Sequence, residues 1–412
     1  MRLIRRAVWL AVLLPWTASA QTTDARCLQC HAKPNLARVD DQGEVSSLAV
    51  DPEQYRASIH REMRCVDCHK DLRTVQSYPH ATSLGPVHCA DCHTAESQQM
   101  AVSAHWLTNL PGRSGKMSCS TCHGTHYILS STNPDSRTNR KNIAAVCLGC
   151  HADQEIIPGS GVKVSAYQYS IHGLKLSAEG NTTAAECVDC HGNHQVLPAD
   201  NPTSSVNKPR IPQTCGRCHK EELPVYEHSI HGAAVSRGIL EAPVCTDCHG
   251  EHTILAPHLA QSAVSRSKIP ETCGKCHERV QLTEKFGIAS DRYSTYEDSY
   301  HGVANQFGRT IVANCASCHG YHDILPLSNP ASSVHPANLA ATCGKCHPNA
   351  GENFTRGKMH VKATLGNSPG VFFVRKFYYG FIGSLMILFI AYILVEYRGY
   401  LRRKKEIGNT KK

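Results

Sequence analysis

The sequence repeats one short pattern, Cys-x-x-Cys-His, eleven times, and these copies use all 22 cysteines. Two thiols three residues apart lie on one helical turn, so both can form thioethers to the vinyl groups of one porphyrin. The next residue then places its imidazole under the iron. This is the attachment pattern of c-type haem. No cysteine is left for a disulfide or a zinc site. The predicted thioether pairs are Cys27 and Cys30, Cys65 and Cys68, Cys89 and Cys92, Cys119 and Cys122, Cys147 and Cys150, Cys187 and Cys190, Cys215 and Cys218, Cys245 and Cys248, Cys273 and Cys276, Cys315 and Cys318, and Cys343 and Cys346.

The histidine that closes each motif is the predicted proximal iron ligand. The alternative for a single Cys-x-x-Cys is a redox-active dithiol, but eleven copies that all end in histidine do not fit it. We therefore expect eleven covalently bound haem c groups. The proximal candidates are His31, His69, His93, His123, His151, His191, His219, His249, His277, His319 and His347.

Eight of the motifs form four two-motif repeats, because a second motif begins 28 residues after the first. A looser pair at Cys65 and Cys89 and a single motif at Cys27 precede them. Within the repeats the first motif continues as His-Gly-x-His, and a further histidine lies 14 or 15 residues upstream of it. A serine precedes that upstream histidine by two positions, and in three repeats a tyrosine precedes it by five.

These two recurrent histidine sets are the candidates for the distal iron ligands. His80 takes the place of the second set in the looser leading pair, and His360 completes the count of eleven. The upstream set is His60, His105, His172, His231 and His301, and the His-Gly-x-His set is His126, His194, His252 and His322. The other four histidines do not recur in phase, so we interpret them as surface or supporting residues: His88, His228, His258 and His335.

A distal histidine of the His-Gly-x-His type cannot serve the haem of its own motif. His126 follows His123 by three residues, and the porphyrin plane lies between His126 and the far face of that iron. We therefore expect it to bind the iron of a different haem, which draws neighbouring porphyrins together. The sequence leaves open which imidazole serves which iron.

The two ends of the chain predict export and membrane anchoring. Residues 1–20 have a basic start, an apolar stretch and Ala18-Ser19-Ala20, which is typical of a cleaved signal peptide. Phe377 to Val395 is free of charged residues and long enough to span a bilayer, and a basic tail follows it. The predicted organisation is 1–20 signal peptide, 21–100 N-terminal three-haem region, 101–365 four two-haem repeats with eight haems, 366–398 transmembrane anchor, and 399–412 basic cytoplasmic tail.

The net charge of +9 does not indicate nucleic-acid binding. Cleavage of the signal leaves +6, and residues 396–412 alone carry +5, so the exported part is near +1 before its haems are counted. Each haem adds two propionates, which makes the outer surface acidic and favours neutral or basic redox partners.

The predicted fold is mostly α-helix and irregular coil, built from two-haem repeats, with one C-terminal transmembrane helix. Aromatic residues make up 6% of the chain, and long apolar runs are absent between the predicted signal peptide and residue 377. Such a chain cannot build an ordinary hydrophobic core, so we expect it to wrap its porphyrins and to fold only with haem inserted.

Two histidines per iron saturate the metal and keep its potential low, so we expect one-electron transfer and not catalysis. The chain resembles the multihaem c-type cytochromes of the cytochrome c3-like and decahaem-type class. The resemblance lies in the Cys-x-x-Cys-His-Gly-x-His motifs and in segments such as Ser170-Ile171-His172-Gly173. The resemblance implies low-potential bis-histidine haems that carry electrons between the quinone pool and periplasmic or extracellular acceptors.

A C-terminal anchor resembles that of cytochrome c subunits that pair with a membrane cytochrome b. The expected setting is therefore the bacterial inner membrane, single-pass, with the haem region in the periplasm. The expected partners are a cytochrome b or another quinone-interacting subunit and periplasmic redox proteins. The alternative is a multihaem oxidoreductase acting on nitrite, hydroxylamine or a sulfur oxyanion at one open haem. All eleven motifs end in histidine, however, and none in the lysine that often signals such an enzyme.

Overall fold

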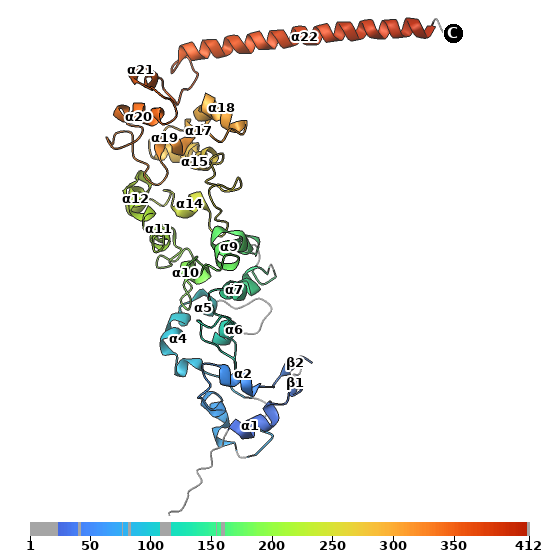
Figure 1. Cartoon of the computed structure of the whole chain (residues 1–412), viewed down its shortest axis with the longest axis vertical. Helices are drawn as coiled ribbons and strands as arrows, with labels where there is room; N and C mark the ends of the chain where they lie inside the picture. The colour runs from blue at the N-terminus through green and yellow to red at the C-terminus, as the bar shows by residue number, and fades with distance from the viewer. Residues whose placement is uncertain are drawn as a thin grey trace, which may run out of the picture. The chain divides into compact units, whose positions relative to one another are not determined.

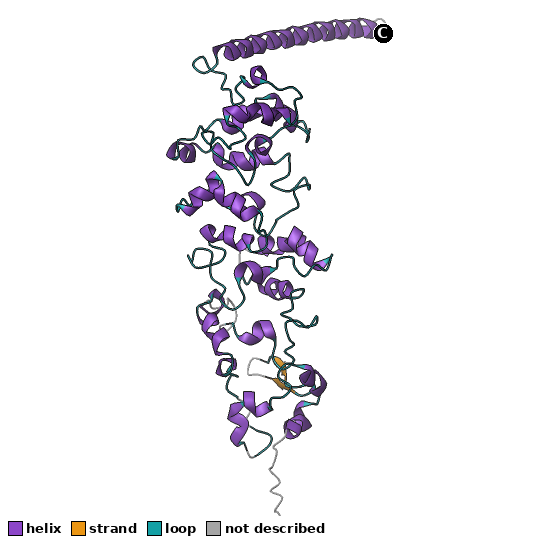
Figure 2. Cartoon of the chain, turned by 60° about the vertical axis from the view of Figure 1, so that its left-hand side comes forward, coloured by secondary structure: helices purple, strands orange, loops and turns teal. Residues whose placement is uncertain are grey.

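The computed structural model describes residues 24–39, 43–75, 77–80, 84–107, 117–153, 155–157 and 161–409. The predicted signal peptide, residues 1–20, lies outside this part. The chain divides into two compact units, Met1–Arg210 and Ile211–Lys412. Figures 1 and 2 show short helices joined by loops throughout, one small pair of strands and one long C-terminal helix. The prediction of a mostly helical and irregular fold is confirmed.

The first unit contains the leading motifs, the first repeat and the start of the second. Its two strands pair antiparallel, with Arg38 opposite Ser46. Its elements are α1 (Asp24–His31), β1 (Ala37–Val39), β2 (Val45–Ser47), α2 (Pro52–Ala57), α3 (Cys65–Cys68), η1 (Lys70–Thr74), η2 (Cys89–Asp91), α4 (Thr94–Ala101), α5 (Ala104–Leu107), α6 (Cys119–His123), α7 (Ile143–His151), α8 (Gly161–Ser165), η3 (Ala166–Tyr169), α9 (Ile171–Ser177), α10 (Cys187–His191) and η4 (Lys208–Arg210).

The second unit contains the remaining repeats and the C-terminal helix. Its elements are α11 (Ile211–Gly216), α12 (Glu222–His228), α13 (Ile230–Ser236), α14 (Cys245–His249), α15 (Ile269–His277), α16 (Val280–Lys285), α17 (Arg292–Glu297), α18 (Tyr300–Gln306), α19 (Cys315–His319), η5 (Pro336–Asn338), α20 (Leu339–Gly344), α21 (Glu352–Thr355) and α22 (Pro369–Asn409).

The first motif of every repeat forms a helix of five residues that ends at a glycine. These glycines have φ between 77° and 83°, a region that favours glycine because it has no Cβ. The chain therefore leaves the helix sharply, directly after the proximal histidine. The glycines are Gly124, Gly192, Gly250 and Gly320.

The recurrent Tyr-x-x-Ser-x-His-Gly segment connects the upstream histidine to the next motif. In α13, Ser229 is the N-cap and its hydroxyl accepts a hydrogen bond from the Gly232 amide. A Cβ on Gly232 would lie 2.1 Å from the Tyr226 carbonyl oxygen, so only glycine fits there. The Tyr226 hydroxyl donates to the carbonyl of Pro243, two residues before the motif at Cys245.

The same tyrosine contact recurs before three other motifs. In each case the hydroxyl donates to the carbonyl two residues before the first cysteine, at 2.8 to 3.1 Å. The repeated tyrosine therefore fixes the entry to these four motifs. The contacts are Tyr55 to Met63, Tyr167 to Ala185, and Tyr296 to Ala313.

Successive repeats are joined by one recurrent backbone hydrogen bond. The amide just before an upstream histidine donates to the carbonyl two residues after a distal histidine of the following repeat, at 2.8 Å each time. The bonds are Ile59 to Ile128, Ala104 to Val196, and Ile230 to Ile324. At these three places the upstream histidine therefore lies beside the following repeat.

Few apolar side chains are buried in the described residues. The largest are Ile143, Leu176, Val244 and Tyr296, and most of the other buried side chains are serines and alanines. Protein alone therefore supplies little of the apolar contact that usually stabilises a fold.

Candidate haem-binding sites

The predicted ligands meet in pairs. Nine pairs of imidazole rings have centroids 6.0 to 6.3 Å apart, and each pair contains one proximal and one distal candidate. The pairs, proximal residue first, are His31 with His80, His69 with His126, His93 with His60, His123 with His194, His151 with His105, His249 with His322, His277 with His231, His319 with His360, and His347 with His301.

This separation fits one iron between two imidazoles. A metal–nitrogen bond of about 2 Å and about 1 Å from nitrogen to ring centre, on each side, give about 6 Å between the ring centroids. Within the described residues no group of three or more His, Cys, Asp or Glu side chains could hold a bare metal ion. Two protein ligands per site is what a haem iron needs, because the porphyrin supplies the other four.

The pairing follows two rules that the sequence left open. An upstream histidine faces the second motif of its own repeat, as His231 faces His277. A histidine of the His-Gly-x-His type faces a motif earlier in the chain: His194 faces His123, and His322 faces His249. Neither lies against the proximal histidine of its own motif, which the glycine turn separates from it.

Four predicted ligands lie outside these nine pairs, and each takes part in an interaction of its own. They hold the same positions in their repeats as the paired histidines do in the others: His172, His191, His219 and His252. Their iron ligation stays a prediction. Of the histidines interpreted as supporting, His228 has its Nδ1 2.7 Å from the Pro224 carbonyl. His335 caps η5, where its Nδ1 accepts from the Ala337 amide.

Neighbouring motifs also approach each other through their cysteines, in two arrangements that alternate along each unit. In the first, the first cysteines of two motifs lie close to each other, as with Cys147 and Cys187 or Cys273 and Cys315. In the second, the second cysteine of one motif lies near both cysteines of the next, as Cys248 does to Cys273 and Cys276. Porphyrins attached at such cysteines would be close neighbours.

Two described contacts orient ligand imidazoles through Nδ1, which leaves Nε2 for the metal. The Nδ1 of His31 lies 2.7 Å from the Leu48 carbonyl oxygen, so it carries the proton and donates. The Nδ1 of His360 lies 3.0 Å from Oγ1 of Thr295. Burial lowers the pKa of His231 to about 4, with a smaller effect from His277, and burial lowers the pKa of His277 too. Burial thus favours the neutral imidazole, the form that binds iron.

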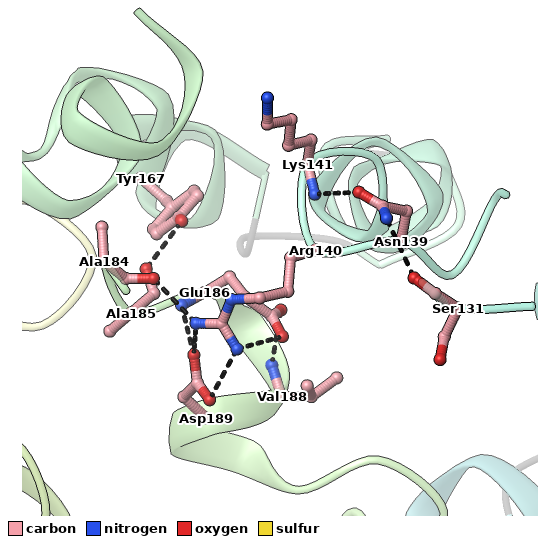
Figure 3. Close-up of polar contacts among 10 residues, drawn as sticks. All are labelled: Ser131, Asn139, Arg140, Lys141, Tyr167, Ala184, Ala185, Glu186, Val188 and Asp189. Atoms are coloured by element: carbon pink, nitrogen blue, oxygen red, sulfur yellow. Dashed lines mark hydrogen bonds and ion pairs between the residues drawn. The ribbon is translucent and has the colours of Figure 1, made fainter. Parts of the chain in front are cut away.

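An arginine that the sequence analysis missed joins two motifs in the first unit (Figure 3). Nη2 of Arg140 contacts Asp189 Oδ2 at 2.5 Å and the Ala184 carbonyl at 2.8 Å, and Nη1 lies 3.9 Å from Glu186 Oε1. Arg140 precedes one motif by seven residues, and Glu186 directly precedes the next. Arg266 holds the equivalent position and donates to the Thr310 carbonyl at 2.8 Å. The position seven residues before a motif, which Arg140 and Arg266 share, is the sequence signal that could have identified this arginine.

A cavity of about 410 Å³ lies in the second unit between α12 and the motif helix α19. Cys318, His322 and Tyr321 line one side of it, and Glu222 and Val225 of α12 line the other. A motif cysteine and a paired histidine therefore both line this space.

One comparison with known proteins finds a match in two parts of the chain. Residues 111–156 and 229–282 match the family model described as "Doubled CXXCH motif". The match points to a multihaem c-type cytochrome. No curated protein and no solved structure matches the chain.

Proposed function

We propose that this chain is a membrane-anchored undecahaem cytochrome c. It carries electrons through low-potential bis-histidine haems between a quinone-linked membrane complex and periplasmic or extracellular acceptors. The nine imidazole pairs carry this proposal, because every pair joins a motif histidine to a second imidazole at the separation that one iron requires.

Bound haem supplies reversible one-electron chemistry. The chain's own part is to saturate each iron and to bring the attachment sites together. With haem bound, the second imidazole of a pair would take the iron position that a substrate needs, and the alternating cysteine contacts place adjacent attachment sites side by side. Both features favour conduction over catalysis.

The anchoring part of the proposal is supported by α22, which is long and apolar enough to cross a membrane and is not buried against the rest of the chain. It contains no histidine, so it offers no imidazole to a b haem. We therefore propose that a cytochrome b or another quinone-interacting subunit passes electrons to the haem region. Direct reduction of the isolated chain by quinol, without any companion subunit, would contradict that partner.

The test is low-temperature electron paramagnetic resonance on the oxidised holoprotein, with haem measured per chain. We expect eleven haems with low-spin ferric signals only. A stoichiometric high-spin signal that shifts with nitrite, hydroxylamine or a sulfur oxyanion would instead establish an open iron and an enzyme.

A further inference from the structure

Helix α18 and the loop after it expose an apolar stripe. Tyr300, Val303 and Phe307 follow one another at helical spacing, and their exposed fractions are 75%, 42% and 84%. Ile311, four residues further on, is 83% exposed. Side chains at positions i, i+3 and i+7 share one helix face, so Tyr300, Val303 and Phe307 form an apolar surface on the second unit. Ile311 is exposed in the loop that follows the positive-φ residue Gly308. We call these four residues the α18 stripe.

The repeat itself does not require this stripe. When the motifs at Cys245 and Cys315 are aligned, Phe307 corresponds to Arg237 and Ile311 corresponds to Glu241. Both charged residues are exposed, and Glu241 forms an ion pair with Lys285. At these two positions the same fold is thus built with charged side chains in the preceding repeat, whereas the position of Tyr300 holds the exposed Ile230 there. Phe307 and Ile311 of the last repeat are therefore not needed to build the repeat.

The α18 stripe is connected to the first turns of α22. Asp298, directly before the N-cap of α18, accepts a hydrogen bond from Nη1 of Arg375 at 2.8 Å. Nε of Arg375 donates to the Tyr379 hydroxyl at 2.9 Å. Arg375 lies two residues before the uncharged stretch that begins at Phe377, where arginine and tyrosine typically mark the membrane–water interface. If α22 spans the bilayer, α18 begins next to its surface.

We propose that the α18 stripe rests in the interface of the lipid bilayer, as a second contact beside α22. This inference rests on the membrane anchoring proposed above. Aromatic and aliphatic side chains on one face of a short segment are what an interfacial contact uses, and exposed Arg309, between Phe307 and Ile311, suits anionic headgroups. The contact would hold the last haem site at the membrane, because His301 of α18 pairs with His347 of the final motif. Electrons from a membrane donor would then enter at that site.

The test uses the full-length holoprotein in lipid nanodiscs of phosphatidylcholine and phosphatidylglycerol. All 22 native cysteines belong to motifs, so a cysteine introduced by Phe307→Cys is the free thiol when every haem is attached. Arg237→Cys is the matched control at the equivalent position of the preceding repeat. The rate of alkylation by a charged maleimide is measured for each variant and divided by its rate in the denatured holoprotein, which removes differences in intrinsic thiol reactivity.

We expect Phe307→Cys to react at least about tenfold more slowly than Arg237→Cys, because a charged reagent does not enter the interface. Equal rates would overturn the inference. Protection that is seen in native membranes and lost in nanodiscs of lipid alone would assign the stripe to a protein partner, and would also overturn it. If Phe307→Cys lowers the haem content, Ile311→Cys takes its place with the same expectation. A chain that does not stay with the lipid discs would show that the membrane anchoring itself is wrong.

Discussion

The four repeats and the leading region supply distal histidines in different ways. In the repeats a glycine with positive φ ends each first-motif helix, and the next distal candidate comes three residues after the proximal one. In the leading region Lys70 follows His69, the chain continues as the 3-10 helix η1, and the next distal candidate is His80, eleven residues on. In both regions the distal candidate faces the proximal histidine of an earlier motif: His194 of the second repeat faces His123, and His80 of the leading region faces His31.

The difference shows what the glycine turn contributes. A residue that tolerates positive φ reverses the chain within three residues, so the ligand is held by the motif helix that precedes it. Without the glycine, a longer segment brings the ligand to the same kind of position. The glycine turn therefore brings a distal histidine to another motif within three residues, whereas the segment between His69 and His80 needs eleven.

The largest expected effect is the loss of one distal ligand from each region. We expect His194→Ala and His80→Ala each to convert one haem per chain from low spin to high spin, because each removes one imidazole of a pair. Electron paramagnetic resonance of the oxidised protein measures the change. His258→Ala, which alters an exposed histidine outside the nine pairs, is the control and should change nothing. If only His194→Ala produced a high-spin haem, the leading loop would not deliver a ligand and the comparison would fail.

The next effect concerns the turn itself. Gly192 has φ 78° and ψ 175°, and a Cβ there would lie 3.3 Å from the Gln195 carbonyl oxygen. We expect Gly192→Ala to lower the free energy of unfolding of the holoprotein by about 2 kcal/mol, because alanine is strained in this region. Urea denaturation followed by haem absorbance measures it. Gly85→Ala in the leading region, where the added Cβ meets an atom at 4.0 Å, is the matched control with little expected effect. An equal loss of unfolding free energy in the two variants would show that the positive φ of Gly192 is not the cause of the destabilisation.

The third prediction compares how much an ion pair in each region contributes to the free energy of unfolding. Arg140→Ala leaves Glu186, whose side chain is 2% exposed, without its cation, and we expect a loss of about 1 to 2 kcal/mol, since Arg140 is itself partly exposed. Lys70 pairs with Asp91 at the surface of the leading region, so Lys70→Ala should lower the free energy of unfolding much less than Arg140→Ala does.

The same pair predicts a pH dependence. Burial raises the pKa of Glu186, so the folded chain holds this proton more tightly than the unfolded chain does. Stability contributed by this group is therefore present at low pH and is lost as pH rises through the folded pKa. Arg140 opposes the shift, so Arg140→Ala should lose more stability at pH 8 than at pH 5 relative to the parent. A loss independent of pH would show that the arginine acts through its contacts with Asp189 and Ala184 alone.

The smallest expected effect concerns the orientation of one ligand. Thr295→Val removes the hydroxyl 3.0 Å from Nδ1 of His360, and we expect a small shift in the potential of one haem with its low-spin state retained. A spectroelectrochemical titration detects it. Ser294→Ala, which removes a neighbouring hydroxyl that bonds only backbone, should leave the titration unchanged. A high-spin signal in Thr295→Val would mean that the hydroxyl is needed to hold the imidazole at all.

Much of this molecule could be predicted because its repeats are local. The motif spacing, the phase of the two histidine sets and the helical, irregular fold depend on residues within a few turns of each other. Arg140 was missed because its partners lie 44 to 49 residues away, although Arg266 shares its spacing before a motif. The contact between Thr295 and His360 spans 65 residues and leaves no periodic signal at all.

The sequence by itself determined which histidines are candidates, since imidazoles that recur in phase with a covalent attachment motif indicate one shared role. Only the tertiary structure decided which two meet, because the partners lie between 33 and 73 residues apart and no local rule connects them. The positive φ of the motif glycines sends a distal histidine of the His-Gly-x-His type away from its own motif, and it meets the proximal histidine of an earlier one. An upstream histidine instead meets the second motif of its own repeat, through a chain segment of about 46 residues that no local pattern describes.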